Sequence, residues 1–140
     1  MSFVLDSSVT LAWVFHEETT PALRQVFTRL GEHGAWVPGL WRLEVANALE
    51  MGVRRGRRSA EFRDQTLADL KLWPVKTDLQ TDRQAWKDTL RLAVEYHLTL
   101  YDAAYLELAV RRALPLATLD RDLREAAVRQ GVVLLGDEKS

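Results

Sequence analysis

Short apolar runs alternate along this chain with longer stretches in which apolar residues recur at helical spacing. Five runs have the length and composition of strands buried on both faces: residues 3–5, 35–37, 73–75, 116–118 and 132–135. Because helical segments separate these runs, neighbouring strands need crossover connections, which favours a mostly parallel sheet. The pattern predicts an α/β fold: one three-layer α/β/α domain over residues 1–140, with a sheet of about five strands.

Start and stop signals place helices between the predicted strands. Thr20 is a candidate N-cap with Pro21 at the first helical position, and Gly31 or Gly34 can end that helix. Ser59 is a candidate cap for a later helix, which an Arg-Gly-Arg segment separates from the preceding one. The remaining apolar periodicity predicts helices over about residues 40–55, 81–97, 101–112 and 120–130.

The composition is that of an ordinary globular protein. Of the 140 residues, 47% are hydrophobic and 28% are charged, which argues against a disordered chain. No apolar run approaches the roughly 20 residues that a membrane-spanning helix needs. The chain also begins without the basic and apolar segments of a signal peptide, so we expect a cytoplasmic protein with no membrane partner.

The chain contains no cysteine, which removes disulfides, thiolate zinc sites, iron–sulfur clusters and cysteine nucleophiles from consideration. Any metal site must therefore use oxygen or histidine ligands. His16, His33 and His97 do not form a metal-binding motif, and we interpret them as structural or surface residues.

Four acidic residues occupy positions where a core would ordinarily place an apolar residue or a cap: Asp6, Glu44, Asp102 and Asp120. Asp6 and Asp120 each follow a predicted strand, and Glu44 lies near the start of the helix after the second strand. Sites in open parallel sheets form beyond the carboxyl ends of the strands, so these three are expected at one edge. Asp102 begins the helix before the fourth strand, and only tertiary packing can bring it to that edge.

Each acid also has a structural interpretation. Asp6 can cap the turn after its strand, and Asp102 can belong to a capping box that Thr99 opens. Asp120 can be the N-cap of the last helix, with Asp122 as a first-turn charge favoured by the helix dipole. Taken one at a time, these interpretations are at least as good as a functional one.

Glu44 is harder to explain structurally, because at helical spacing it shares a face with Leu40, Ala48 and Met51. A charge on an apolar face is expensive unless it is paired, and an arginine partner is the competing explanation.

As a set, the four acids favour a bound cation. Carboxylates a few ångströms apart repel each other by several kcal/mol at an intermediate dielectric. Mg²⁺ or Mn²⁺, which prefer oxygen ligands, would offset that repulsion, activate water and stabilise charge on a phosphate. We expect Ser7, Ser8 and Thr118 to hydrogen-bond the acids rather than to act as nucleophiles.

The net charge of −1 provides no general attraction to nucleic acid, so a polyanion would need local arginine clusters. Two such clusters exist, Arg54, Arg55, Arg57 and Arg58 in one and Arg111 and Arg112 in the other. The ordinary interpretation of each is a solvated helix end, and the alternative is a set of phosphate contacts.

Four segments together resemble the PIN-domain ribonucleases, and within them the VapC-type toxins of bacterial toxin–antitoxin pairs: residues 3–8, 43–49, 100–106 and 117–123. The resemblance covers nearly the whole chain in order, spacing and expected local structure. It implies a Mg²⁺- or Mn²⁺-dependent endoribonuclease with RNA as its substrate. Ser7 departs from the Thr or Asn that follows the first acid in many relatives.

The resemblance also implies roles and partners. Asp6 and Asp102 would be the principal metal ligands, Glu44 and Asp120 would complete the site directly or through water, and Asp122 would assist or replace Asp120. Family members commonly dimerise. They are held inactive by an antitoxin whose C-terminal segment packs into a groove and reaches the acidic pocket.

Two other classes of function remain open at this point. One is a catalytically silent PIN-like module that only binds a partner protein. The other is a receiver-like signalling domain with Asp78 as its phosphoacceptor, although the neighbouring acids expected after the first strand are absent.

Overall fold

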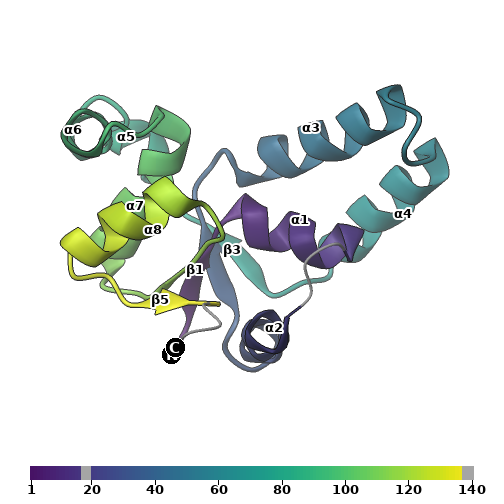
Figure 1. Cartoon of the computed structure of the whole chain (residues 1–140), viewed down its shortest axis with the longest axis horizontal. Coiled ribbons are helices and arrows are strands. Elements are labelled where there is room, and N and C mark those ends of the chain that lie inside the picture. The colour runs from purple at the N-terminus through teal and green to yellow at the C-terminus, as the bar shows by residue number, and fades with distance from the viewer. Residues whose placement is uncertain (17–19, 137–140) are drawn as a thin grey trace.

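The computed structural model describes residues 1–16 and 20–136, and within them a five-stranded, fully parallel sheet in the order β3-β2-β1-β4-β5. The strands are β1 (Phe3–Leu5), β2 (Ala35–Val37), β3 (Val75–Thr77), β4 (Leu116–Ala117) and β5 (Leu134–Leu135). Helices cover both faces, with α1 and α2 on one side and α7 and α8 on the other (Figure 1). The predicted fold class is confirmed.

The helices are α1 (Ser7–Phe15), α2 (Pro21–His33), α3 (Trp41–Arg54), α4 (Ala60–Leu70), α5 (Thr81–Gln84), α6 (Asp88–Tyr96), α7 (Leu100–Arg112) and α8 (Arg121–Arg129). Two predicted caps are present. The hydroxyl of Thr20 accepts a hydrogen bond from the amide of Leu23, and that of Ser59 accepts one from Phe62. Gly34, rather than Gly31, ends α2, because its positive φ of 72° suits a residue without a side chain.

Three predicted elements need correction. β3 begins at Val75 instead of residue 73, because Trp73 packs edge-on against Trp13 and Phe27 instead of joining the sheet. β5 begins at Leu134 instead of residue 132. The helix predicted over 81–97 is interrupted between α5 and α6, which leaves Trp86 in the break with 88% of its surface exposed.

The sequence pattern did not predict α1. Its nine residues, SSVTLAWVF, are apolar on nearly every side, so they show no amphipathic period. The helix packs against α3 and buries Val9, Ala12 and Trp13. It matters for the site because it begins directly after β1 and fixes the backbone around Asp6.

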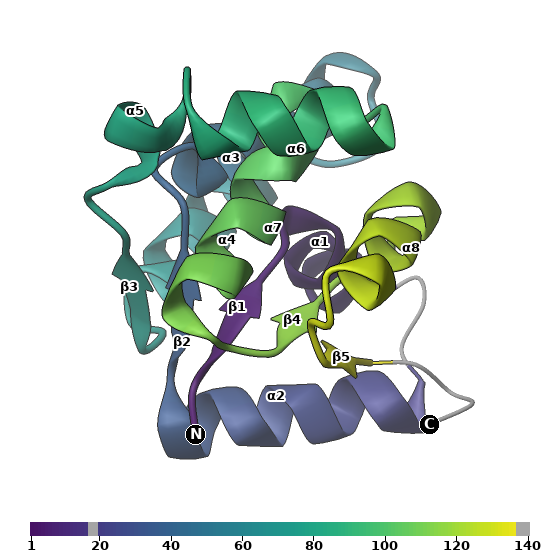
Figure 2. The ribbon, with the colours of Figure 1, turned by 90° about the vertical axis from the view of Figure 1, so that its left-hand side faces the viewer.

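Helix α7 is the most buried helix, with residues 103–109 all inaccessible to solvent. It contacts β1 and β4 on one side and α6 and α8 on others, and it crosses the middle of the molecule (Figure 2). Its first turn therefore ends up beside the carboxyl ends of β1 and β4.

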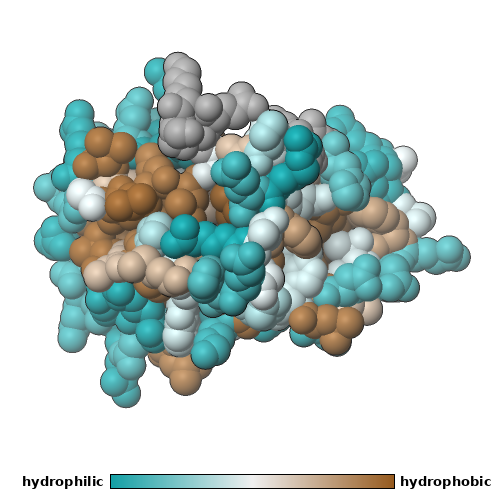
Figure 3. Space-filling model, turned by 90° about the horizontal axis from the view of Figure 1, so that it is seen from below, coloured by the Kyte–Doolittle hydropathy of each residue, from teal (hydrophilic) through white to brown (hydrophobic). Residues whose placement is uncertain are grey.

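The two edges of the sheet differ. The face seen from below, at the amino ends of the strands, mixes hydrophilic and hydrophobic surface (Figure 3). The upper edge, where β1 leads into α1, is bordered by the starts of α3 and α7 (Figure 1).

In the described residues, no helix has the length and apolar character needed to cross a membrane.

Candidate active site

The carboxyl edge of the sheet brings together the four acids singled out in the sequence. Asp6 is the N-cap of α1 and Asp120 is the N-cap of α8, while Glu44 and Asp102 lie in the first turns of α3 and α7. The charges of Asp6, Glu44 and Asp120 all act on Asp102, which places the four carboxylates in one electrostatic cluster. Packing of α7 against β1, β4 and α8 delivers Asp102.

Asp6 is the most buried acid of the cluster, with 3% of its surface exposed. The hydroxyls of Ser8 and Thr118 both donate hydrogen bonds to its Oδ2, at 2.6 and 2.7 Å. Burial raises the pKa of Asp6, these hydrogen bonds lower it, and the nearby charge of Asp120 raises it again, with a net increase. The side chain makes no helix-cap hydrogen bond, so capping does not explain its position.

Asp120 both caps α8 and is linked to Asp6 through Thr118. Its Oδ1 accepts a hydrogen bond from the amide of Leu123 at 2.8 Å, which is the N-cap interaction that the sequence suggested. Its own amide donates to the hydroxyl of Thr118, the same hydroxyl that donates to Asp6. Thr118 thus connects the two acids that follow β1 and β4. Asp122 is exposed and is not among the charges that act on Asp102.

Glu44 is half-buried, and the phenol of Tyr105 donates a hydrogen bond to its Oε1 at 2.6 Å. Burial raises the pKa of Glu44, the Tyr105 hydrogen bond lowers it, the charge of Asp6 raises it, and the hydroxyl of Ser7 lowers it. The net shift is upward. Within residues 1–16 and 20–136, Glu44 forms no ion pair, so the structure does not support an arginine as its partner.

Asp102 is the acid on which the charges of the other three all act. Burial, and then the charges of Asp120, Asp6 and Glu44, raise its pKa to about 6, against a hydrogen bond with Thr99 that lowers it. The amide of Asp102 donates to the Thr99 hydroxyl at 3.1 Å, so Thr99 does cap α7 as the sequence suggested. Thr99 thus contacts both the backbone and the carboxylate of Asp102.

The cluster has the chemistry of a site for a hard cation. Its donors are all carboxylate oxygens, and burial and neighbouring acids raise the pKa values of Asp6, Glu44 and Asp102. No three acidic or histidine side chains of the described residues are placed to hold one ion together. Mg²⁺ commonly uses one or two carboxylates and keeps several waters, so the donor set fits such an ion with the remaining acids acting through water.

Asp78 lies outside this cluster, at the end of β3, with a fully buried side chain. Arg111 donates to both of its oxygens, at 3.1 and 2.6 Å, and Arg112 donates twice to Oδ1, at 3.2 and 3.0 Å. Arg112 also stacks over the ring of Trp36 at 3.6 Å. These contacts remove Arg111 and Arg112 from the candidate phosphate contacts, and Asp78 from the role of phosphoacceptor.

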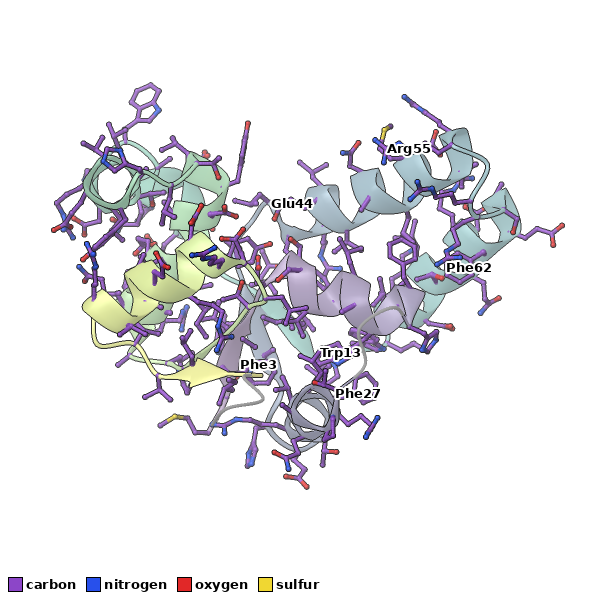
Figure 4. The ribbon with its side chains drawn as sticks, in the orientation of Figure 1. Phe3, Trp13, Phe27, Glu44, Arg55 and Phe62 are labelled. Atoms are coloured by element: carbon purple, nitrogen blue, oxygen red, sulfur yellow. The ribbon has the colours of Figure 1, made fainter. Side chains whose placement is uncertain are left out.

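The other arginine cluster is only partly available. Arg54 pairs with Glu50 at 2.8 Å, and Arg58 lies over the rings of Phe15 and Phe62. Arg55 and Arg57 are exposed. Arg55 lies at the far end of α3 from Glu44 (Figure 4), and a helical rise of about 1.5 Å per residue puts the two roughly 16 Å apart.

Sequence reasoning missed Tyr105. Its spacing of three residues from Asp102 places both on one face of α7, but nothing in that spacing indicates contact with Glu44 on another helix. The histidines take no part in the site: His16 and His97 end α1 and α6 with positive φ, and His33 is exposed beside Glu32.

Comparisons with known proteins agree with this fold. The PIN domain family profile matches residues 3–129. Ribonuclease VapC3 from Pyrobaculum aerophilum is 30% identical over 125 residues, which span 89% of this chain and 94% of that protein. The crystal structure of PAE2754 from Pyrobaculum aerophilum superposes with a TM-score of 0.64 and 24% identity, covering 96% of this chain and 89% of the other.

Two more distant structures share the fold alone. FitAcB from Neisseria gonorrhoeae gives a TM-score of 0.65 at 12% identity, with 96% of each chain covered. A toxin–antitoxin complex from Klebsiella pneumoniae gives 0.58 at 17% identity, covering 86% of this chain and 88% of the other. The family profile over most of the chain, together with the VapC3 similarity, shows that this chain belongs to the PIN domain family.

Proposed function

We propose that this chain is a divalent-metal-dependent endoribonuclease that hydrolyses phosphodiester bonds in RNA. The observation that carries the proposal is the cluster of four carboxylates from four separate segments, none of which is ion-paired among the described residues. Such a cluster costs free energy in a folded protein unless a cation offsets it. Membership of the PIN domain family and the similarity to a protein named ribonuclease VapC3 support the same activity.

The four acids have different proposed roles in binding the cation. Asp6 and Asp102 are the proposed principal ligands, Glu44 and Asp120 complete the site directly or through water, and Asp122 assists Asp120. A bound Mg²⁺ or Mn²⁺ would supply activation of a water molecule and neutralisation of the charge that builds up on the phosphate.

The chain's own residues prepare this site before any ligand arrives. Ser8 and Thr118 hold one oxygen of Asp6, and Thr118 ties Asp6 to the backbone of Asp120. A carboxylate held in this way loses little further conformational entropy when it binds a ligand.

Arg55 and Arg57 are the proposed phosphate contacts, with Arg54 and Arg58 in supporting positions. They would bind an RNA strand that extends from the acids along α3.

We place the antitoxin partner in a groove of about 980 Å³ between α1, α2 and α4. The groove is lined by Trp13, Phe27, Phe62, Leu70 and Trp73, and polar side chains lie along its rim. Trp13 and Phe27 meet edge-on with ring centroids 5.0 Å apart, and Phe62 comes from a third helix, α4 (Figure 4). An amphipathic segment with apolar anchors suits such a groove, and the Klebsiella structure is a toxin–antitoxin complex with this fold.

A second copy of the chain is proposed to cover the exposed apolar side chains of α6 and of the two loops that flank α5. Leu79 and Trp86 are 86% and 88% exposed, and Leu90 and Val94 lie exposed on α6. Leu90 and Val94 line one shallow hollow together, and a contiguous exposed apolar patch marks an interaction surface. Light scattering of the wild type and of Trp86→Ser tests this part: a dimer that the substitution dissociates is expected, and a wild-type monomer at every concentration would contradict it.

The activity is tested with a mixed RNA pool, the wild type and Asp6→Asn, each in EDTA and in Mn²⁺. We expect cleavage only by the wild type and only with Mn²⁺. Full cleavage by Asp6→Asn, or cleavage in EDTA, would contradict the proposed site. A wild type that neither binds Mn²⁺ nor cleaves any RNA would instead favour the silent protein-binding module, for which the aromatic groove is the supporting observation.

A further inference from the structure

Tyr105 is a buried aromatic residue whose phenol donates a hydrogen bond to an acid of the proposed site. The side chain is fully inaccessible to solvent, and its phenol donates to Glu44 Oε1 at 2.6 Å. This length is that of an O–H donor bound to a charged carboxylate, which is about twice as strong as a neutral hydrogen bond. The two residues are 61 positions apart and come from α7 and α3.

Glu44 needs such an anchor to hold a fixed position. A glutamate side chain has three rotatable bonds, and the position of Glu44 in the first turn of α3 leaves it only half-buried. The phenol is the stronger of two hydroxyl contacts to the carboxylate, the other coming from Ser7. The side chain of Glu44 therefore loses its conformational entropy during folding. Ligand binding does not have to supply that cost a second time.

Tyr105 also links Glu44 to Asp102. The two residues of α7 lie three positions apart, so they share one face of the most buried helix in the protein. One rigid element therefore sets the position of the Asp102 carboxylate and, through the phenol, that of Glu44.

The hydrogen bond distinguishes the two oxygens of Glu44. The phenol donates to Oε1, and a weaker contact from the Ser7 hydroxyl also acts on the carboxylate. Asp6 is arranged in the same way, because the hydroxyls of Ser8 and Thr118 both donate to Oδ2. Hydroxyl groups thus hold one oxygen of each carboxylate.

We infer that Tyr105 is a positioning residue that fixes Glu44 so that its carboxylate serves the cation or its bound water. This inference rests on the proposed function. It concerns a residue that touches neither the cation nor the RNA and acts only through Glu44.

The first test compares Tyr105→Phe with Tyr96→Phe by titrating Mn²⁺ into metal-stripped protein. Tyr96 is a matched control, because its hydroxyl also takes part in a 2.6 Å hydrogen bond, with Gln130, but lies on α6 outside the site. Groups that orient metal ligands typically contribute 10- to 100-fold to affinity. We expect a loss of about tenfold or more in Mn²⁺ affinity for Tyr105→Phe and none for Tyr96→Phe.

The second test needs no metal. Melting temperatures of the wild type, Tyr105→Phe, Glu44→Ala and the double variant, all in EDTA, form a double-mutant cycle. Tyr105→Phe is expected to change the melting temperature in the wild-type background and to have little effect once Glu44 is gone, because the phenol has then already lost its partner. Strictly additive changes would contradict the anchoring role.

The outcomes separate the inference from the proposed function. A wild type that fails to bind Mn²⁺ would overturn the proposed function and the cation-related role of Tyr105 with it. Wild-type binding with unchanged affinity in Tyr105→Phe would overturn the inference alone. Weakened binding together with a non-additive cycle would support both.

Discussion

Two buried acidic regions at the carboxyl ends of parallel strands have opposite surroundings. Asp6 follows β1, is clustered with three other acids and has a raised pKa. Asp78 follows β3 in a fully buried position, where burial raises its pKa but the hydrogen bonds and charges of Arg111 and Arg112 lower it by more, so the pKa lies below its ordinary value. The Asp78 region carries its own compensating charge, whereas the acids of the Asp6 cluster accept hydrogen bonds only from neutral hydroxyl and amide groups in the described residues.

The difference shows that burial of a carboxylate does not by itself mark a functional site. A buried acid whose charge is satisfied within the protein serves the fold, as Asp78 does by joining β3 to the end of α7. A buried group of acids without a basic partner leaves a charge to be satisfied from outside. Substitutions in the two regions should therefore have opposite consequences for stability and activity.

The largest expected effect is on activity. Asp102→Asn removes a proposed ligand, and we expect RNA cleavage to fall by on the order of a thousandfold, which corresponds to roughly 4 kcal/mol of transition-state stabilisation. Asp78→Asn, assayed below its melting temperature, should retain cleavage within a fewfold. Single-turnover cleavage rates in Mn²⁺ measure both, and equal losses in the two variants would erase the distinction between the regions.

The next largest effect is on stability. Asp78→Asn leaves Arg112 without its carboxylate partner and leaves Arg111 paired with Glu107 alone, and breaking a buried ion pair costs about 3 kcal/mol at the lower end of the usual range. The lower end applies because Arg111 and Arg112 keep 25% and 34% of their side-chain surfaces exposed. Asp102→Asn should not destabilise the metal-free protein, because it removes repulsion. Urea unfolding in EDTA tests both, and a larger loss for Asp102→Asn would contradict the comparison.

A smaller effect is expected in the pH dependence of stability. The folded-state pKa of Asp102, about 6, exceeds its ordinary value of 3.8, so between these values the folded protein binds more protons than the unfolded chain. Its contribution to stability therefore increases as pH falls from 7 to 5, whereas the contribution of Asp78 is lost only below its ordinary pKa. We expect the melting temperature in EDTA to respond more favourably to this pH change in the wild type than in Asp102→Asn. Identical responses would contradict the raised pKa.

The smallest expected effect separates the two arginine clusters. Replacing exposed Arg55 and Arg57 together by alanine should raise the KM for RNA by about three- to tenfold and reduce its salt dependence, because phosphate contacts release counterions. The fold should be unaffected. Replacing Arg112 by alanine should instead lower the melting temperature, since it pairs with Asp78 and stacks on Trp36. A KM that is insensitive to Arg55 and Arg57 would remove them from the RNA path.

Parts of the site could be predicted because sequence order alone determines them. Asp6 and Asp120 each follow a strand, and the carboxyl ends of parallel strands share an edge. Thr20, Ser59 and Thr99 cap their helices through contacts only three residues away, which local sequence encodes.

Other parts depend on packing that local sequence does not encode. The position of Asp102 depends on how α7 lies against β1 and α8, and the Tyr105–Glu44 bond depends on the approach of two helices. The pairing of Arg111 and Arg112 with Asp78 joins residues more than thirty positions apart. Helix α1 was not predicted for a different reason. Its residues are apolar on most sides, so they lack the amphipathic period by which a helix is identified in a sequence.

Titration of Mn²⁺ into metal-stripped wild type, Asp6→Asn and Asp78→Asn tests whether the acidic cluster binds a cation. We expect the wild type and Asp78→Asn to bind Mn²⁺ with similar affinity and Asp6→Asn not to bind it measurably. No binding by the wild type, or equal binding by the wild type and Asp6→Asn, would contradict the assignment of the acidic cluster as a metal site.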